Sequence, residues 1–244
     1  MKMNDFAQMT VGDIVSHDSA AAYVFDRFGI DFCCGGNRLL SEICEKGGIR
    51  LEDVVACLSA PKREMPADHL AFYRWPLDLL VDYVLKIYHR NWKAGALKIK
   101  DLAHKVAEVH GETHPELLEV RDLFDAALTA LEEHFDKEEQ ILFPYIYELV
   151  QAVENKTPVP EFHCGSISFP IAVMEDDHEA EGERFKYMRK ITNGFTAPQD
   201  GCASYRLLME ELDRFEQHLH RHIHLENNLI FPQAIELQNS HMAS

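Results

Sequence analysis

The sequence lacks any apolar run long enough to cross a membrane. A membrane-spanning helix needs about 20 mostly apolar residues in succession, and no stretch of the 244-residue chain is apolar enough to qualify. The first 13 residues, MKMNDFAQMTVGD, also lack the hydrophobic centre of a secretory signal peptide. We therefore expect a cytoplasmic protein that has no membrane partner.

Positive charge is scarce as well. Lys and Arg together number 24 against 41 Asp and Glu, which gives a net charge of −17 at pH 7. A protein that binds nucleic acid presents a surface rich in Lys and Arg to the phosphates, so we expect no nucleic-acid partner. The acidic composition favours solubility, and it also attracts metal cations.

Cysteine is infrequent, with six residues in the chain, two of them adjacent. A disulfide framework is typical of short secreted chains with spaced pairs of cysteines, and this pattern does not fit it. Cys33 and Cys34 lie instead in a glycine-rich loop, DFCCGGN at 31–37. The adjacent thiols have two interpretations, a buried or merely reduced pair, or a site of thiol redox chemistry or of transient iron and nitrosyl handling.

Glycine and proline become sparse after residue 76, and apolar residues recur there with helical spacing. We expect long helices at 77–110, 116–152, 170–193 and 201–237. Four such helices favour an all-α fold, an antiparallel four-helix bundle at 77–237. Short helical segments indicate a small N-terminal domain at 1–60, and three prolines indicate a linker at 61–76. Residues 238–244 are expected to be a tail whose final His-Met-Ala-Ser looks like a cloning remnant.

An eleven-residue pattern occurs twice in the predicted bundle. It reads HFDKEEQILFP at 134–144 and HIHLENNLIFP at 222–232. Each copy places a His and a Glu four residues apart, His134 with Glu138 and His222 with Glu226, which puts both on one face of a helix. Imidazole and carboxylate are ligands of iron, manganese and zinc, so the two copies predict the two halves of one metal site.

Both glutamates of the pattern lie on an apolar stripe, where an unpaired carboxylate is very unfavourable. No Lys or Arg lies on either stripe to compensate the charge. One further histidine lies on the apolar stripe of each remaining helix, His89 on the first and His178 on the third. His89 precedes His134 by 45 residues and His178 precedes His222 by 44, so the bundle consists of two similar hairpins.

This inventory predicts two metal ions in the core of the bundle. Each ion would bind two histidines, and both would share two bridging carboxylates, from the set His89, His134, Glu138, His178, His222 and Glu226. Helical bundles rich in carboxylates hold di-iron and di-manganese centres, whereas a tetrahedral zinc site needs no such duplication. The alternative is a set of ordinary hydrogen-bonded buried side chains.

Other polar residues near the stripes receive separate predictions. His110 lies 21 residues beyond His89, about 32 Å along a continuous helix, and is expected to end that helix. Glu181, one turn after His178, is the candidate for a carboxylate that orients a ligand. Three histidines of the last helix fall off its apolar stripe and are expected to be solvated, namely His218, His220 and His224.

At these motifs the sequence resembles the repair-of-iron-centres proteins, a family with a hemerythrin-like bundle. The resemblance covers residues 8–235 and rests on Tyr88-His89, 106–111, 134–144, 173–178, 225–232 and the cysteine loop at 28–36. It implies a non-haem di-iron centre, with two iron ions bridged by an oxo group and carboxylates, and it implies the six ligands named above. One departure is Asp177, which stands where we expect a Glu.

The resemblance also implies a function, the repair of iron–sulfur clusters damaged by nitrosative or oxidative stress, through donation of iron. Its partners would be damaged iron–sulfur proteins, with nitric oxide or O2 as small ligands. Two alternatives stay open, a reductase of nitric oxide or peroxide and a hemerythrin-like sensor that binds O2 or nitric oxide. Whether the protein is an enzyme and whether it forms a homodimer are left open.

The resemblance places Cys33 and Cys34 in the signature of the short N-terminal domain. This favours a functional role for the two thiols, in redox chemistry or in the transient handling of iron and nitrosyl groups. We expect the short domain to lie near the open end of the bundle.

Overall fold

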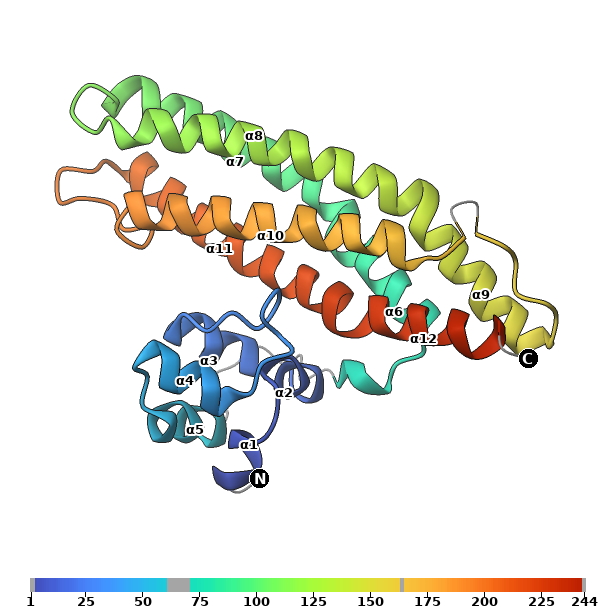
Figure 1. Cartoon of the computed structure of the whole chain (residues 1–244). Helices are drawn as coiled ribbons and strands as arrows, with labels where there is room; N and C mark the ends of the chain where they lie inside the picture. The colour runs from blue at the N-terminus through green and yellow to red at the C-terminus, as the bar shows by residue number, and fades with distance from the viewer. Residues whose placement is uncertain (1–2, 61–70, 163–164, 243–244) are drawn as a thin grey trace.

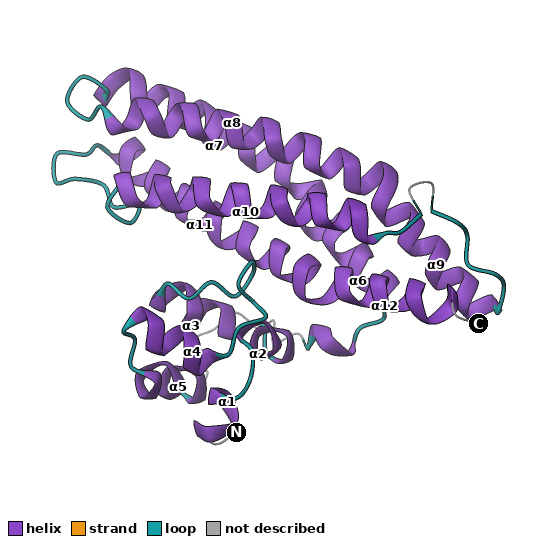
Figure 2. Ribbon diagram, viewed as in Figure 1, coloured by secondary structure: helices purple, strands orange, loops and turns teal. Residues whose placement is uncertain are grey.

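The computed structural model describes residues 3–60, 71–162 and 165–242, and every regular element in these residues is a helix (Figure 2). The expected all-α fold is therefore confirmed. The longest helices lie side by side as a bundle, and a group of short helices packs against its flank (Figure 1). Among the described residues, no helix has the length and apolar character needed to cross a membrane.

Five short helices form the N-terminal group: α1 (Met3–Ala7), α2 (Val11–His17), α3 (Ala21–Phe28), α4 (Leu40–Gly47) and α5 (Leu51–Ser59). The side-chain oxygen of Thr10 accepts a hydrogen bond from the amide of Asp13 and caps the start of α2. Helices α3 and α4 end at Gly29 and Gly48, whose φ angles of 65° and 64° glycine adopts at little cost. The apolar faces of these helices enclose a small core of their own.

Four long helical arms form the bundle, and three of them contain a wider turn. The first arm is α6 (Leu77–Tyr83), η2 (Val84–His89) and α7 (Arg90–His110), and the second is α8 (Glu116–Lys137), η3 (Glu138–Leu142) and α9 (Phe143–Asn155). The third is α10 (Ser168–Ile191), and the fourth is α11 (Ala203–Leu225), η4 (Glu226–Ile230) and α12 (Phe231–Met242). Successive arms run in opposite directions, as expected for an antiparallel bundle (Figure 1).

Two apolar clusters fill the bundle, one on each side of its middle. The first joins α7, α8, the C-terminal part of α10 and α11, and includes Phe124 and Phe185. The second joins α6, α9, the N-terminal part of α10 and α12, and includes Ile146 and Phe231. Burial of apolar side chains is the main driving force for folding, so the polar side chains between these clusters need a separate explanation.

The fourth arm is longer than expected, because its helix continues to Met242 and does not end at residue 237. Gln238, which was expected to begin a tail, is buried. Its side-chain oxygen accepts a hydrogen bond from the amide of Ile167, and its amide nitrogen donates to the hydroxyl of Tyr145. Contacts with other arms therefore extend the helix; residues 243–244 lie outside the described residues.

The chain enters the bundle through a short 3-10 turn, η1 (Phe72–Arg74). Phe72 is buried against the rings of Trp75 and Tyr83. The ring of Tyr73 stacks on His17 of α2, with 3.9 Å between the ring centroids. The end of the expected linker is thus part of the packed structure, while its residues 61–70 lie outside the described residues.

The N-terminal helices lie against the flank of the fourth arm, near its middle, and not at an end of the bundle as expected (Figure 1). The side-chain amide of Asn228, in η4, donates a hydrogen bond to the carbonyl oxygen of Cys33 at 2.9 Å. In the preceding helix α11, Nδ1 of His220 lies 3.4 Å from a carboxylate oxygen of Asp26. The cysteine loop is therefore held beside the bundle by direct polar contacts.

Candidate metal centre

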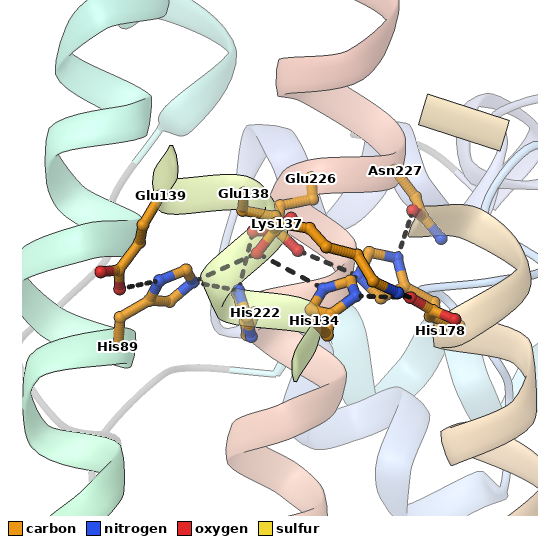
Figure 3. A network of polar contacts seen from close by, with 10 residues as sticks. His89, His134, Lys137, Glu138, Glu139, His178, His222, Glu226 and Asn227 are labelled. Carbon is orange, nitrogen blue, oxygen red and sulfur yellow. Dashed lines mark hydrogen bonds and ion pairs between the residues drawn. The ribbon is translucent and has the colours of Figure 1, made fainter. Parts of the chain in front are cut away.

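Six polar side chains meet between the two apolar clusters of the bundle (Figure 3). They form two overlapping groups whose ligand atoms lie within 4.8 Å of one another: His89, His222, Glu138 and Glu226 in one, and His134, His178, Glu138 and Glu226 in the other. Each group takes one histidine from each hairpin, so neither hairpin forms a group by itself. The structure thus brings together all six residues that the sequence pattern singled out.

The imidazole nitrogens of each group face one another and the carboxylates. The Nε2 atoms of His89 and His222 are 3.3 Å apart, and those of His134 and His178 are 3.0 Å apart. Each carboxylate approaches one imidazole of each group, at distances of 2.8 to 3.5 Å: Glu138 approaches His89 and His134, and Glu226 approaches His222 and His178. Both glutamates therefore lie between the two groups.

The glutamates of both copies lie at the start of a π-helical turn. The amide of Phe143 donates to the carbonyl of Glu138, and the amide of Phe231 donates to that of Glu226, each five residues back. The proline after each phenylalanine has no N–H, and its ring clashes with the carbonyl four residues back, so a regular α-helix cannot continue. The Phe-Pro that closes each copy thus accounts for the wider turn, and such turns are frequent at functional sites.

Hydrogen bonds outside the two groups determine which nitrogen of an imidazole faces inward. Nδ1 of His89 lies 2.9 Å from a carboxylate oxygen of Glu139, and Nδ1 of His178 lies 2.7 Å from the side-chain oxygen of Asn227 (Figure 3). Because these oxygens accept, Nδ1 of each ring donates the hydrogen bond and Nε2 is the nitrogen that faces the site. Orientation by a neighbouring acceptor is typical of histidines that bind metals.

Asp177 provides the same support for a third ligand. One of its carboxylate oxygens lies 3.4 Å from Nδ1 of His134 and accepts a hydrogen bond from Lys137 at 3.0 Å. Partial burial opposes ionisation of Asp177, but the hydrogen bonds from Lys137 and His134 outweigh it and lower the pKa of the carboxyl group. The aspartate, where we expected a glutamate, is therefore a charged acceptor next to the site.

Glu181 and His110 lie where the sequence pattern predicts, but neither pairs with a candidate ligand. Glu181 is buried on the core side of α10, but it pairs with Arg184 at 3.1 Å and not with a ligand histidine. With Asp177 it lines a cavity of about 110 Å³ that reaches two of the histidines. His110 ends α7, and its Nε2 lies 3.2 Å from Sγ of Cys202, away from the metal site.

The site is buried, and its carboxylates lack hydrogen-bonding partners. All six side chains are at most 6% exposed. Neither carboxylate oxygen of Glu138 accepts a hydrogen bond within the described part of the chain, and the same holds for Oε2 of Glu226. Buried carboxylates without a partner are strongly unfavourable, and imidazole lone pairs also face them. Two cations would satisfy both kinds of ligand, so these side chains fit a two-metal site.

Burial also sets the protonation of the histidines. Burial, with the electrostatic effect of the neighbouring His222 ring, lowers the pKa of His89 to about 3, and burial, with that of the His178 ring, lowers the pKa of His134 to about 3. Both rings are therefore neutral at pH 7, which is the form that binds a metal.

The two glutamates differ in charge when no metal is bound. Burial and the neighbouring carboxylate of Glu226 raise the pKa of Glu138. Burial opposes ionisation of Glu226 too, but the electrostatic effect of the neighbouring His222 and His178 rings outweighs it and lowers the pKa of Glu226. One carboxyl group thus holds a proton while the other holds a negative charge.

The adjacent cysteines lie in a loop that Asp31 organises. Its Oδ1 accepts hydrogen bonds from the amides of Cys33 and Cys34, each at 3.0 Å, and its Oδ2 accepts one from the amide of Gly35 at 2.9 Å. The two Sγ atoms are 4.0 Å apart, and Cys33 is buried against the bundle while Cys34 is exposed. The contact with Cys34, together with burial, raises the pKa of the Cys33 thiol. Cys33 is thus a protonated thiol, and Cys34 is the accessible one.

The histidines expected to be solvated differ from one another. His218 is exposed and His220 is partly buried, but His224 is only 1% exposed, so the expectation is wrong for this residue. The N-terminal domain covers it: Nε2 of His224 lies 3.4 Å from Oγ of Ser16, and Nδ1 lies 3.3 Å from the carbonyl oxygen of Phe32. Helical periodicity within the bundle does not reveal this contact, because a second domain makes it.

Sequence reasoning also missed the two asparagines that follow Glu226. Asn227 orients His178, a candidate ligand, and Asn228 contacts the carbonyl oxygen of Cys33. Asparagine is a weak helix former, so two in succession inside a long predicted helix were the available signal.

Known families match both parts of the chain. Residues 80–234 match the family described as hemerythrin HHE cation binding domain, and residues 7–62 match the ScdA_N family, described as a domain of unknown function. The chain is 32% identical over 233 residues to the iron-sulfur cluster repair protein YtfE of Yersinia pseudotuberculosis serotype IB (strain PB1/+), covering 95% of this chain and 98% of that protein. The protein of the same name from Yersinia pestis matches with the same identity and coverage.

Proposed function

Because the chain belongs to the family of iron-sulfur cluster repair proteins with a hemerythrin domain, we propose that it holds two iron ions and donates iron to damaged iron–sulfur clusters. The observation that carries the proposal is the pair of buried glutamates, Glu138 and Glu226, each lying between two histidine pairs. Each iron would be held by two imidazoles and the two shared carboxylates, with an oxo group as a further bridge.

The ligand chemistry supports iron over a structural zinc ion. Imidazole and carboxylate suit non-haem iron, whereas structural zinc sites are closed by four ligands, often cysteines, around one ion. In this arrangement two shared carboxylates and four imidazoles would serve two ions, which leaves positions for exogenous ligands. Bound iron would supply redox chemistry and exchangeable coordination positions.

Donation requires that iron leave the core and that the emptied ligands accept it again. The cavity of about 110 Å³ beside the site reaches His134 and His178 and is lined also by Asp177, Glu181 and Arg184, so it gives iron a polar space next to its ligands. His89 and His134 have pKa values of about 3, so both rings stay neutral after iron leaves and need not lose a proton before iron returns. The site therefore suits iron as cargo that is both released and replaced.

The test is the transfer of iron from the loaded protein to an apo iron–sulfur enzyme, in the presence of sulfide and a reductant. Recovery of the enzyme's activity should accompany a matching loss of iron from the protein. An equal concentration of ferrous salt with a chelator controls for free iron, and Glu138→Ala protein taken through the same loading controls for the site. No recovery, with the iron retained, would contradict donation.

The same cavity favours a second candidate, the binding or reduction of a small molecule such as nitric oxide, O2 or peroxide. Its volume exceeds the roughly 30 Å³ that one water occupies in the liquid, and it reaches His134 and His178. Sustained turnover with an added reductant and constant iron content would favour a reductase. Reversible binding without turnover would favour a sensor, and a strictly stoichiometric reaction would exclude the reductase.

A further inference from the structure

Three successive residues of η4 join the metal site to the N-terminal domain. Glu226 approaches a histidine of each group, and Asn227 accepts the hydrogen bond of His178. Asn228, the next residue, contacts the other domain, where its side-chain amide donates to the carbonyl oxygen of Cys33. One turn of helix therefore contacts both the metal ligands and the cysteine loop.

Asn228 fits between two glycines of the N-terminal domain with no spare room. A Cβ atom at Gly36 would overlap Oδ1 of Asn228, and a Cβ atom at Gly12 would lie 2.8 Å from it, closer than real Cβ contacts. The amide of Gly12 also donates to the carbonyl oxygen of Gly36 at 2.8 Å, which joins the two sides of this socket. Gly36 is the last residue of the Cys-Cys-Gly-Gly sequence, so its lack of a side chain is explained by the entry of Asn228.

His224, one helical turn before Asn228, closes the same contact. It is buried between Ser16 and the carbonyl oxygen of Phe32, and its Nδ1 lies 3.3 Å from the side-chain amide of Asn228. Packed interfaces of this kind transmit a displacement because they contain no space to absorb it. A movement of η4 must therefore move the loop or break these contacts.

We propose that η4 couples the loading of the metal site to the opening of the Cys33-Cys34 loop, with Asn228 as the positioning residue. The inference rests on the proposed function, since it requires a metal at Glu226. A bound metal holds Glu226 and His178 in place, and through Asn227 it holds the turn. Without the metal, η4 can move, and because Asn228 is packed between Gly12 and Gly36, this movement displaces the cysteine loop. Cys33, buried in the closed loop, then becomes accessible, so the loop distinguishes the loaded chain from the empty one.

The test measures how fast iodoacetamide alkylates each cysteine of the full-length protein, with peptides resolved by mass spectrometry. Cys33 should react at least about fivefold more slowly in the iron-loaded protein than in the metal-free protein, the lower end of typical coupling between two sites. Cys44 is 2% exposed in the core of the N-terminal domain, and its rate should be nearly the same in both states. It therefore controls for a general gain in stability on loading.

Two variants of Asn228 separate coupling from mere support of the loop. Asn228→Ala should remove the difference between the loaded and metal-free rates at Cys33, with unchanged iron content. Asn228→Asp keeps the size of the side chain but lacks the amide donor, and it should also remove the difference at Cys33. It replaces the alanine variant if that variant folds poorly. Gln140→Ala is the matched control, because exposed Gln140 occupies the corresponding position of the first copy, and it should keep the difference. If Asn228 only supported the loop, its replacement would raise the Cys33 rate equally in the loaded and in the metal-free protein.

Equal Cys33 rates in the loaded and metal-free wild-type protein would overturn the inference, as would a difference that survives in both Asn228 variants. An equal change at Cys44 would also overturn it, since loading would then act on the whole domain. Iron content is measured on the same samples, so a wild-type protein that takes up no iron is recognised separately and contradicts the proposed function itself.

Discussion

The two copies of the eleven-residue pattern place the same ligands and face different surroundings. In each copy a histidine and a glutamate belong to the buried cluster of candidate ligands, a π-turn begins at the glutamate, and a proline follows. Two other positions differ: Asp136 and Gln140 of the first copy are exposed, while the corresponding His224 and Asn228 of the second contact the N-terminal domain. The shared positions thus build the candidate metal site, and the divergent ones make a contact in the second copy.

A further pair of positions shows how the copies keep one role with different chemistry. Glu139 of the first copy and Asn227 of the second each accept a hydrogen bond from a histidine of a different arm. Glu139 offers a carboxyl oxygen and its side chain is 47% exposed, whereas Asn227 offers an amide oxygen. The role requires an acceptor at this position, and the surroundings decide which acceptor is present.

Removing either glutamate should have the largest effect, because each carboxylate belongs to both histidine groups. Glu138→Ala and Glu226→Ala should each lower the iron content from about two ions per chain, the number in carboxylate-bridged bundles, to well below one. Elemental analysis of purified protein measures this, with Glu183→Ala on the exposed face of α10 as the control. Full iron content in either variant would show that its copy is dispensable.

Replacing each glutamate by glutamine should change the stability of the metal-free protein by different amounts in the two copies. Glu226 is ionised and bonded to His222 at 2.8 Å, so Glu226→Gln should lower the free energy of unfolding by about 2–3 kcal/mol at pH 7. Glu138 holds a proton because of its raised pKa, so the neutral glutamine should change the stability by less than about 1 kcal/mol. Urea denaturation measures both, and equal losses would refute the assigned charges.

The acceptors outside the site should have a smaller effect on metal retention. Asn227→Ala and Glu139→Ala should each weaken iron binding by about 10- to 100-fold, the usual effect of losing such a partner. The loss should be smaller for Glu139, because solvent reaches its position and can replace the acceptor. The rate of iron transfer to a chelator measures this effect, and Gln140→Ala serves as the control. Unchanged rates would mean that the histidines need no orienting acceptor.

The smallest effect should be a pH dependence that only the second copy has. Burial lowers the pKa of His224 to about 4, against about 6.5 in the unfolded chain. The unfolded state therefore binds more protons below pH 6.5, and this residue should make stability fall by about 1 kcal/mol per pH unit as the pH decreases towards 5. His224→Gln should make the dependence shallower in the metal-free protein, while Asp136→Asn should not. Urea denaturation at several pH values measures the slope, and an unchanged slope in His224→Gln would contradict a neutral buried ring.

The sequence predicted those features that depend on periodicity within a helix. The first arm has the expected limits, since Gly111 and Pro115 interrupt the helical pattern after it. The six candidate ligands were found because four helices each carry a polar residue on an apolar stripe. Burial of His224, insertion of Asn228 and extension of the last helix through Gln238 were not predicted. These features depend on contacts between segments far apart in the chain, which the spacing of residues within one helix does not encode.

The central claim is that two buried glutamates serve two metal ions at once. Elemental analysis of wild-type protein produced in iron-rich medium tests it most directly. The account predicts about two iron ions per chain, the content of a carboxylate-bridged di-iron bundle. One iron per chain, or none, would contradict it, because one of the two histidine groups around Glu138 and Glu226 would then bind no metal.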